Sequence, residues 1–160
     1  MAETELLWRL ADTALQAGDF ERARDIWERG AGLGDPECWV GLGVMFDVGQ
    51  GVEVDKHRAM RCYKTAWRSR NLSAANNIAV LYREWGNKRA MFQWFERAAR
   101  HGDDEAYLEL AKCYRDGLGV RKSLPNAVRC LAKVTAGSDV SEAGRDEAAE
   151  MLASFQPRAI

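Results

Sequence analysis

The chain has 160 residues, of which 47% are hydrophobic and 29% charged, as in globular domains long enough to bury their own core. Its 23 basic and 24 acidic residues give a net charge of −1. The chain thus lacks the basic excess typical of nucleic-acid-binding proteins, which argues against that function. No apolar run approaches the roughly 18 residues of a membrane span, and the acidic start Met-Ala-Glu-Thr-Glu is unlike a secretory signal, so we expect a cytoplasmic protein that does not bind membranes.

The first predicted element is a helical hairpin over about residues 4–34. Small and apolar residues at helical spacing predict its first helix, which ends at the turn Gly18-Asp19. Glycine suits this place because it can adopt the positive φ that terminates a helix. Ala23 and Trp27 then fall on the buried side of the second helix.

The second predicted hairpin covers about residues 35–71 and has a longer connection. Asp35 followed by Pro36 indicates a capped helix start. The segment Gly49-Gln50-Gly51-Val52 ends this helix, and Ala59 anchors the next one. Both helices show apolar or small residues at the i, i+3, i+4 spacing of an amphipathic helix.

Two further hairpins and a single helix complete the prediction. The third hairpin, about residues 72–102, turns at Gly86-Asn87 and lacks the longer connection. The fourth covers about residues 103–137, and a loop then leads to a capping helix over about residues 144–155. A lone helix with a polar outer face can close the end of a stack of repeats. We expect residues 156–160 to be frayed.

A shift of 68 residues superimposes the second hairpin on the fourth without a gap. Residues 35–52 then match residues 103–120, including the two aspartates at the helix starts and both Gly-x-Gly-Val segments. This shift is two periods of about 34 residues, a length typical of helix-turn-helix repeats.

The pattern Leu42-Gly43-x-x-Phe46-x-x-Gly-x-Gly-Val, followed by Asp55 and Ala59, resembles a unit of the Sel-one-like repeat (SLR) family. The opening unit resembles the shorter tetratricopeptide repeat instead, and the segment 73–99 departs from the pattern because it has no Gly-x-Gly loop. The resemblance covers residues 4 to about 137. It implies a right-handed all-α solenoid of about four tetratricopeptide-like repeats with a capping helix, forming one domain over residues 1–160.

The residues that could carry chemistry have structural explanations. The four cysteines form no Cys-x-x-Cys pair, so we expect free, buried thiols and no metal or cofactor. His57 and His101 stand among charged residues at loop–helix junctions and are expected to be solvated. The Gly-x-Gly segments lack the Lys-Ser/Thr of a phosphate-binding loop. We therefore expect no enzymatic activity.

The resemblance implies that the first helices of the repeats line a concave groove that binds another protein. The predicted inner-face residues run from an acidic N-terminal end to a largely basic C-terminal end: Glu5, Trp8, Asp12, Glu37, Val40, Val44, Asp47, Ser73, Asn76, Val80, Arg83, Glu105, Leu108, Lys112 and Arg115. Among the six tryptophans, Trp27, Trp39 and Trp94 fall on core positions, whereas Trp8 and Trp85 are candidate exposed anchors.

Three roles remain open at this stage. Short bacterial SLR proteins include immunity proteins that neutralise a toxin or effector, and a non-enzymatic chain of this size suits that role. A regulatory or scaffolding adaptor is the first alternative. RNA binding is the second, since helical repeats of this length can read single-stranded bases, although the acidic inner-face residues Glu5, Asp12, Glu37 and Asp47 argue against it.

Overall fold

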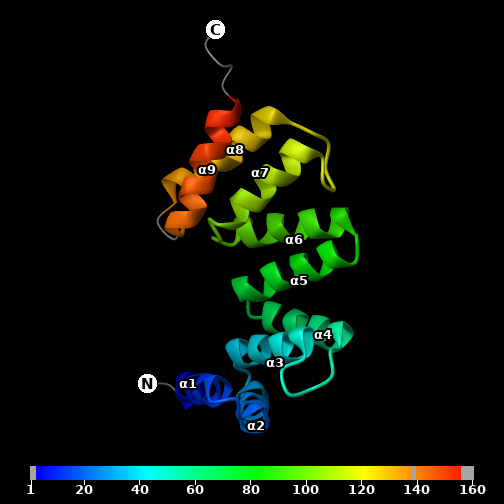
Figure 1. Ribbon diagram of the computed structural model, residues 1–160, viewed down its shortest axis with the longest axis vertical. Coiled ribbons are helices and arrows are strands. Elements are labelled where there is room, and N and C mark those ends of the chain that lie inside the picture. Colours follow the sequence, from blue (N-terminus) through cyan, green and yellow to red (C-terminus); the bar gives the residue numbers. More distant parts are fainter. Residues whose placement is uncertain (1–2, 138–139, 156–160) are drawn as a thin grey trace. The chain divides into compact units, whose positions relative to one another are not determined.

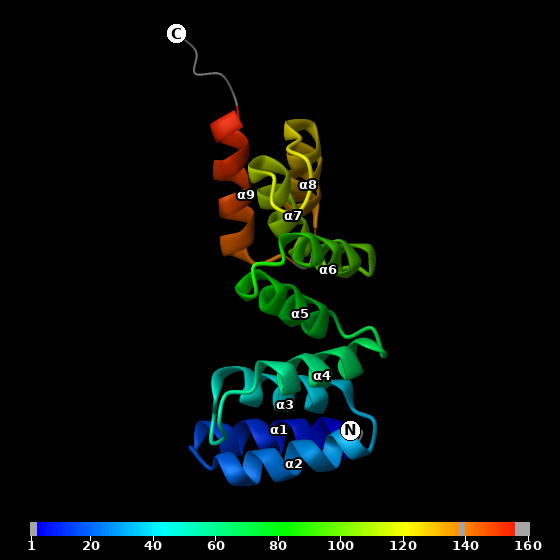
Figure 2. The same cartoon turned by 90° about the vertical axis from the view of Figure 1, so that its right-hand side faces the viewer.

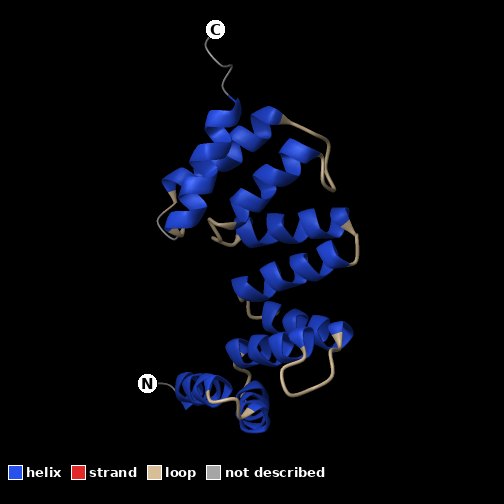
Figure 3. Cartoon of the chain, in the orientation of Figure 1, coloured by secondary structure: helices blue, strands red, loops and turns tan. Residues whose placement is uncertain are grey.

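The computed structural model describes residues 3–137 and 140–155, and this part of the chain forms nine helices and no strand (Figures 1 and 3). The all-α prediction is thereby confirmed. No helix of the described part is long and apolar enough to cross a membrane. The helices are α1 (Glu3–Gln16), α2 (Phe20–Gly32), α3 (Pro36–Val48), α4 (Lys56–Trp67), α5 (Leu72–Glu84), α6 (Lys88–Arg100), α7 (Ala106–Asp116), α8 (Leu124–Ala136) and α9 (Glu142–Phe155).

The chain divides into two compact units, residues Met1–Ile78 and Ala79–Ile160. In the first, α1 packs against α2, α2 against α3 and α3 against α4, and α1 also contacts α3 (Figure 2). Glycines bring α3 close to both neighbours, since a Cβ at Gly41 would overlap the ring of Trp27 and one at Gly43 the ring of Tyr63. Both rings are buried. The core of this unit therefore depends on large rings packed against bare backbone.

In the second unit, α6 packs against α7, α7 against α8 and α8 against α9. Its core is purely apolar, with side chains contributed by every helix of the unit: Leu81, Met91, Phe95, Leu110, Leu131, Val134 and Met151. The predicted capping helix exists as α9 and buries Ala148 and Met151. It begins at Glu142, two residues earlier than predicted. The predicted frayed end, residues 156–160, lies outside the described residues.

The 68-residue repeat extends to the backbone conformation of nearly the whole chain. Every glycine with a positive φ in the described part has a partner 68 residues away: Gly18 and Gly86, Gly34 and Gly102, Gly49 and Gly117, Gly51 and Gly119. The helix caps follow the same shift, because side chains accept backbone N–H bonds at Asp19 and Asn87, at Asp35 and Asp103, and at Asp55 and Ser123. The predicted hairpin turns at Gly18, Gly49, Gly86 and Gly117 are confirmed.

The longer connections are built alike in the two units (Figure 3). Gly49 and Gly117 end α3 and α7 in the left-handed conformation, with φ of 76° and 75°. The second glycine of each loop lies against the first residue of an earlier helix, Gly51 against Phe20 and Gly119 against the backbone of Lys88. Only a residue without a Cβ allows this approach, which explains the Gly-x-Gly spacing.

One sequence interpretation needs correction. Trp39, predicted to be a core residue, is only half-buried, whereas Trp27 and Trp94 are buried as predicted. The side chain of Glu105, the residue before α7, makes no capping bond, and Asp103 caps the helix instead. The Glu105 carboxylate accepts the backbone N–H of Ser141 at 2.9 Å and so holds the start of α9.

The four cysteines are unpaired and buried. Burial, reinforced by Asp35 and Glu37, raises the pKa of the Cys38 thiol to about 12. Burial likewise raises the pKa of Cys113 to about 11. Among the described residues, no group of three or more His, Cys, Asp or Glu side chains could hold a metal ion.

We expect the four thiols of the folded protein to resist iodoacetamide at pH 8 and to react within minutes in urea, because alkylation requires an exposed thiolate. Unfolded cysteines ionise near pH 9.0, below the folded values. The folded state therefore binds more protons, and stability should fall as the pH rises above about 9 towards 12. Mass spectrometry after timed alkylation measures the first effect and urea titrations the second. Equal labelling rates with and without urea would contradict the buried assignment.

Candidate functional site

The predicted inner-face residues of the first unit lie on the solvent sides of α1 and α3, two helices in contact. Trp8 is 39% exposed, and Val40 and Val44 are half-buried on the side of α3 away from Cys38 and Met45, which are fully buried. We call Trp8, Asp12, Glu37, Val40, Val44 and Asp47 the Val40 face. The side chain of Glu5 lies outside the described residues.

The carboxylates of the Val40 face are already engaged within the unit. Asp47 accepts bonds from Lys56 Nζ at 2.5 Å and from the Tyr63 hydroxyl at 3.1 Å, which ties α3 to α4. Glu37 accepts the Asn71 amide at 2.6 Å. The acidic end predicted from the sequence therefore presents less free charge than its composition suggests, and apolar side chains form the centre of the face.

The basic end predicted in the second unit is largely neutralised. Glu109 of α7 binds both Arg83 of α5 and, at 2.8 Å, Lys112. Lys112 also reaches Glu147 of α9 at 2.9 Å. Burial acts to raise the pKa of Glu109, but Lys112 and Arg83 outweigh it and lower that pKa. These side chains hold three helices together and offer little charge to a partner.

The other predicted inner-face positions are mixed. Leu108 is only 7% exposed and belongs to the core of the second unit. Arg115 is exposed but pairs with its neighbour Asp116 at 2.7 Å. On α5, Ser73 is exposed, Asn76 is half-buried and Val80 is 36% exposed. Trp85, the second candidate anchor, is exposed at the turn after α5.

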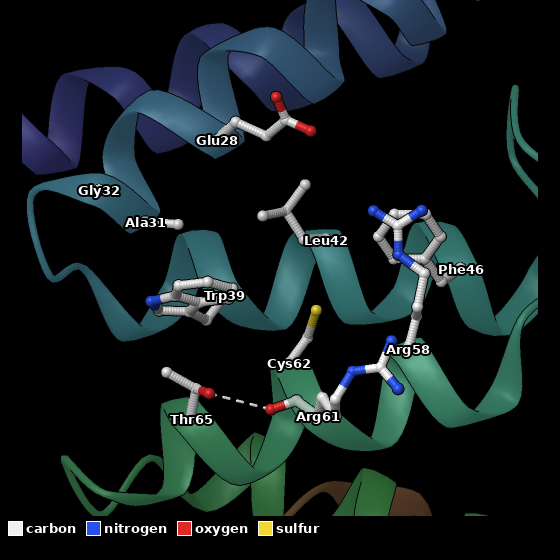
Figure 4. A pocket seen from close by; sticks show the side chains of 10 residues that line it. All are labelled: Glu28, Ala31, Gly32, Trp39, Leu42, Phe46, Arg58, Arg61, Cys62 and Thr65. Carbon is white, nitrogen blue, oxygen red and sulfur yellow. Dashed lines mark hydrogen bonds between the residues drawn. The ribbon is translucent and has the colours of Figure 1, made fainter.

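A second surface, which the sequence interpretation missed, is a pocket of about 550 Å³ between α2 and α4. Its floor is the side of α3 that carries Trp39, Leu42 and Phe46 (Figure 4). This is a different side of α3 from the one that carries Val40 and Val44. We call it the Trp39 groove; its remaining lining residues are Glu28, Ala31, Gly32, Arg58, Arg61, Cys62 and Thr65.

The signal for this groove was present but ambiguous. Trp39 follows the core spacing of α3, so its partial exposure could not be recognised without the positions of α2 and α4. Burial raises the pKa of Cys62 although Arg58 and Arg61 act to lower it, so this side chain lines the groove as a neutral thiol. The groove is thus apolar in its centre and charged along its edges.

Comparison with known proteins finds the same kind of repeat that the glycine pattern indicates. The family model described as Sel1 repeat matches residues 39–66, 92–103 and 104–133. No curated protein matches the chain. The middle match is short, in keeping with the hairpin that lacks the Gly-x-Gly loop.

Solved structures share the fold at low sequence identity. A Sel1 repeat protein from Oxalobacter formigenes has a TM-score of 0.74 at 23% identity, covering 86% of this chain and 59% of that chain. A protective antigen of uropathogenic Escherichia coli, displaying an SLR fold, has a TM-score of 0.74 at 16% identity over 92% of this chain and 38% of that chain. A Klebsiella pneumoniae subsp. pneumoniae protein described as a sel1 repeat protein has a TM-score of 0.59 at 18% identity, covering 99% and 79%.

The present chain thus spans less than two thirds of the first two of these structures. The fold, the Gly-x-Gly loops and the family matches agree with one another. The chain therefore carries Sel1 repeats, which are generally protein-interaction modules, and it shares the all-α fold of the solved Sel1 repeat structures.

Proposed function

We propose that this chain binds a partner protein through the Val40 face and that the partner is a toxin or effector which binding neutralises. The observation that carries the proposal is that two helices in contact each present apolar side chains to solvent: α1 exposes Trp8, and α3 leaves Val40 and Val44 half-buried. Tryptophan surrounded by apolar side chains is typical of the central residues of protein interfaces.

Two features of the chain support protein binding over RNA binding. Its charged side chains are acidic, and Asp47 and Glu37 are held by partners within the unit. The basic residues that could have contacted phosphates in the second unit, Arg83 and Lys112, are bound to Glu109. An apolar, weakly charged face suits a protein surface better than a phosphate backbone.

The proposed neutralising role requires binding alone. An inhibitor acts by covering the active surface of its target, so the helical face needs no nucleophile, metal or cofactor. A regulatory or scaffolding adaptor would bind in the same way, and only the behaviour of the partner distinguishes the two roles.

The test uses the products of the open reading frames that flank the gene of this chain. Each is expressed alone and together with the chain, and growth and binding by calorimetry are measured. A product that arrests growth alone, and is both bound and neutralised by the chain, supports the immunity role. A bound product without toxicity supports the adaptor, and the absence of any bound product contradicts the proposal.

The double substitution Val40→Glu and Val44→Glu should weaken binding of that product by about 2–4 kcal/mol, roughly 30- to 1,000-fold, because it places two charges at the centre of the interface. Circular dichroism should show unchanged helical content. Val128→Glu is the matched control, since Val128 is an exposed valine of α8 in the other unit. If the double variant binds as tightly as the parent chain, the Val40 face is not the binding surface.

A further inference from the structure

The Trp39 groove has an apolar centre and one strongly basic wall. Figure 4 shows Glu28 on the α2 side, Arg58 and Arg61 on the α4 side, and Trp39 and Leu42 between them. The apolar floor continues to Phe46, whose ring centroid lies 3.9 Å from the Arg58 guanidinium carbon. An arginine stacked on an aromatic ring keeps its N–H groups free to bind an acceptor.

The acidic residue of one wall, Glu28, forms no ion pair with Arg58 or Arg61 on the other wall. Glu28 already faces Arg24 of its own helix at 3.9 Å. Neither Arg58 nor Arg61 has a carboxylate within ion-pair distance among the described residues, and both side chains are exposed. The α4 wall therefore presents two guanidinium groups that form no ion pair within the described residues.

The corresponding positions of the second unit carry longer side chains. A shift of 68 residues places Arg100 at Gly32 and Lys133 at Thr65, so two long side chains replace two small ones. Arg100 pairs with Glu96 at 3.0 Å, and Arg129, the counterpart of Arg61, binds the side chain of Asn126. The second unit thus has longer side chains at two of these positions, and its arginines are bound within their own helices, whereas the Trp39 groove has small residues there and two arginines without an ion pair.

We infer that the Trp39 groove binds an acidic segment of a partner protein, with a large apolar side chain against Trp39 and Leu42 and a neighbouring aspartate or glutamate paired with Arg61 and Arg58. A carboxylate matches the planar guanidinium group in a bidentate pair. The pocket volume of about 550 Å³ is sufficient for one aromatic or leucine side chain with its flanking backbone. This site goes beyond the Val40 face and does not depend on it.

A neighbouring pocket favours a peptide over a nucleic acid. It shares Glu28, Phe46 and Arg58 with the Trp39 groove and continues to the loop residues Glu53 and Asp55. A polyanion following the groove would meet these carboxylates. A peptide with one acidic residue beside its apolar side chain would leave the part of the pocket near Glu53 and Asp55 empty, or place a basic residue there.

The test selects peptides from a random display library on the intact chain and measures them by fluorescence anisotropy. Selected peptides should combine tryptophan, phenylalanine or leucine with aspartate or glutamate a few residues away. Arg61→Glu should weaken their binding about tenfold or more, because it replaces an attraction by a repulsion. Trp39→Ala should weaken it as well, and added salt should reduce it. Arg61 is exposed, so its substitution should leave the fold intact.

Lys64→Glu is the matched control: it makes the same charge change on the same helix, at an exposed residue outside the groove. It should bind the peptides like the parent chain, and so should the Val40→Glu, Val44→Glu double variant, which separates this site from the Val40 face. Three results would overturn the proposal: selected peptides without acidic residues, equal binding by the Arg61→Glu variant, or Arg61-dependent binding of a single-stranded RNA oligonucleotide in place of any peptide.

Discussion

Replacing Trp27 with alanine is expected to lower the free energy of unfolding by about 3–5 kcal/mol, the range for removing a large buried aromatic side chain. Trp27 is 4% exposed, and its ring lies against the backbone of Gly41. Because α2 reaches α3 through this ring, its removal leaves a cavity that two packed helices cannot easily close. Urea unfolding followed by circular dichroism measures the change.

Trp39→Ala is the comparison for this prediction. Both tryptophans occur at core spacing in the sequence, but Trp39 is half-buried on the floor of the groove. Its removal exposes little new apolar surface and should lower stability much less than the loss of Trp27. If the two substitutions lowered stability equally, the distinction between core and groove would be wrong.

The helices and turns could be predicted because their signals are local. A glycine that ends a helix and an aspartate that caps one act within a few residues, so the pairs Gly49 and Gly117 and Asp35 and Asp103 were recognisable in the sequence and are confirmed. The 68-residue shift made these signals stronger, since each occurs twice.

The charge of the inner face could be predicted only in part, because ion pairs join residues far apart in the chain. The sequence gives Arg83 and Lys112 as basic positions on successive first helices, but it does not show that Glu109 lies between them. Leu108 had the spacing of an inner-face residue, yet it is buried. The predicted acidic-to-basic gradient is therefore much weaker than the composition implies.

The Trp39 groove could not be predicted, for a related reason. It depends on the space between α2 and α4, where Gly32 and Thr65 stand at positions that carry Arg100 and Lys133 in the other unit. In the repeat alignment these differences look like ordinary surface variation. Their consequence becomes visible only when the helices are packed.

Replacing Gly119 with alanine is expected to lower the free energy of unfolding by about 2–5 kcal/mol, the sum of two effects. The φ of Gly119 is 73°, a conformation that places alanine under strain of roughly 1–2 kcal/mol. The new Cβ would also overlap the backbone carbonyl of Lys88 at the start of α6, and relieving such overpacking costs about 1–3 kcal/mol more. Urea unfolding monitored at 222 nm measures the total.

Gly86→Ala separates the two effects within the same unit. Gly86 has a similar φ of 72°, but a Cβ there would meet no atom within 4 Å. Only the conformational strain should therefore remain, and stability should fall by roughly 1–2 kcal/mol. The difference between the stability losses of the two variants gives the free-energy cost of disturbing the contact between the extended loop and α6. Equal losses for Gly119→Ala and Gly86→Ala would mean that this contact is unimportant and that Gly119 is needed only for its backbone conformation.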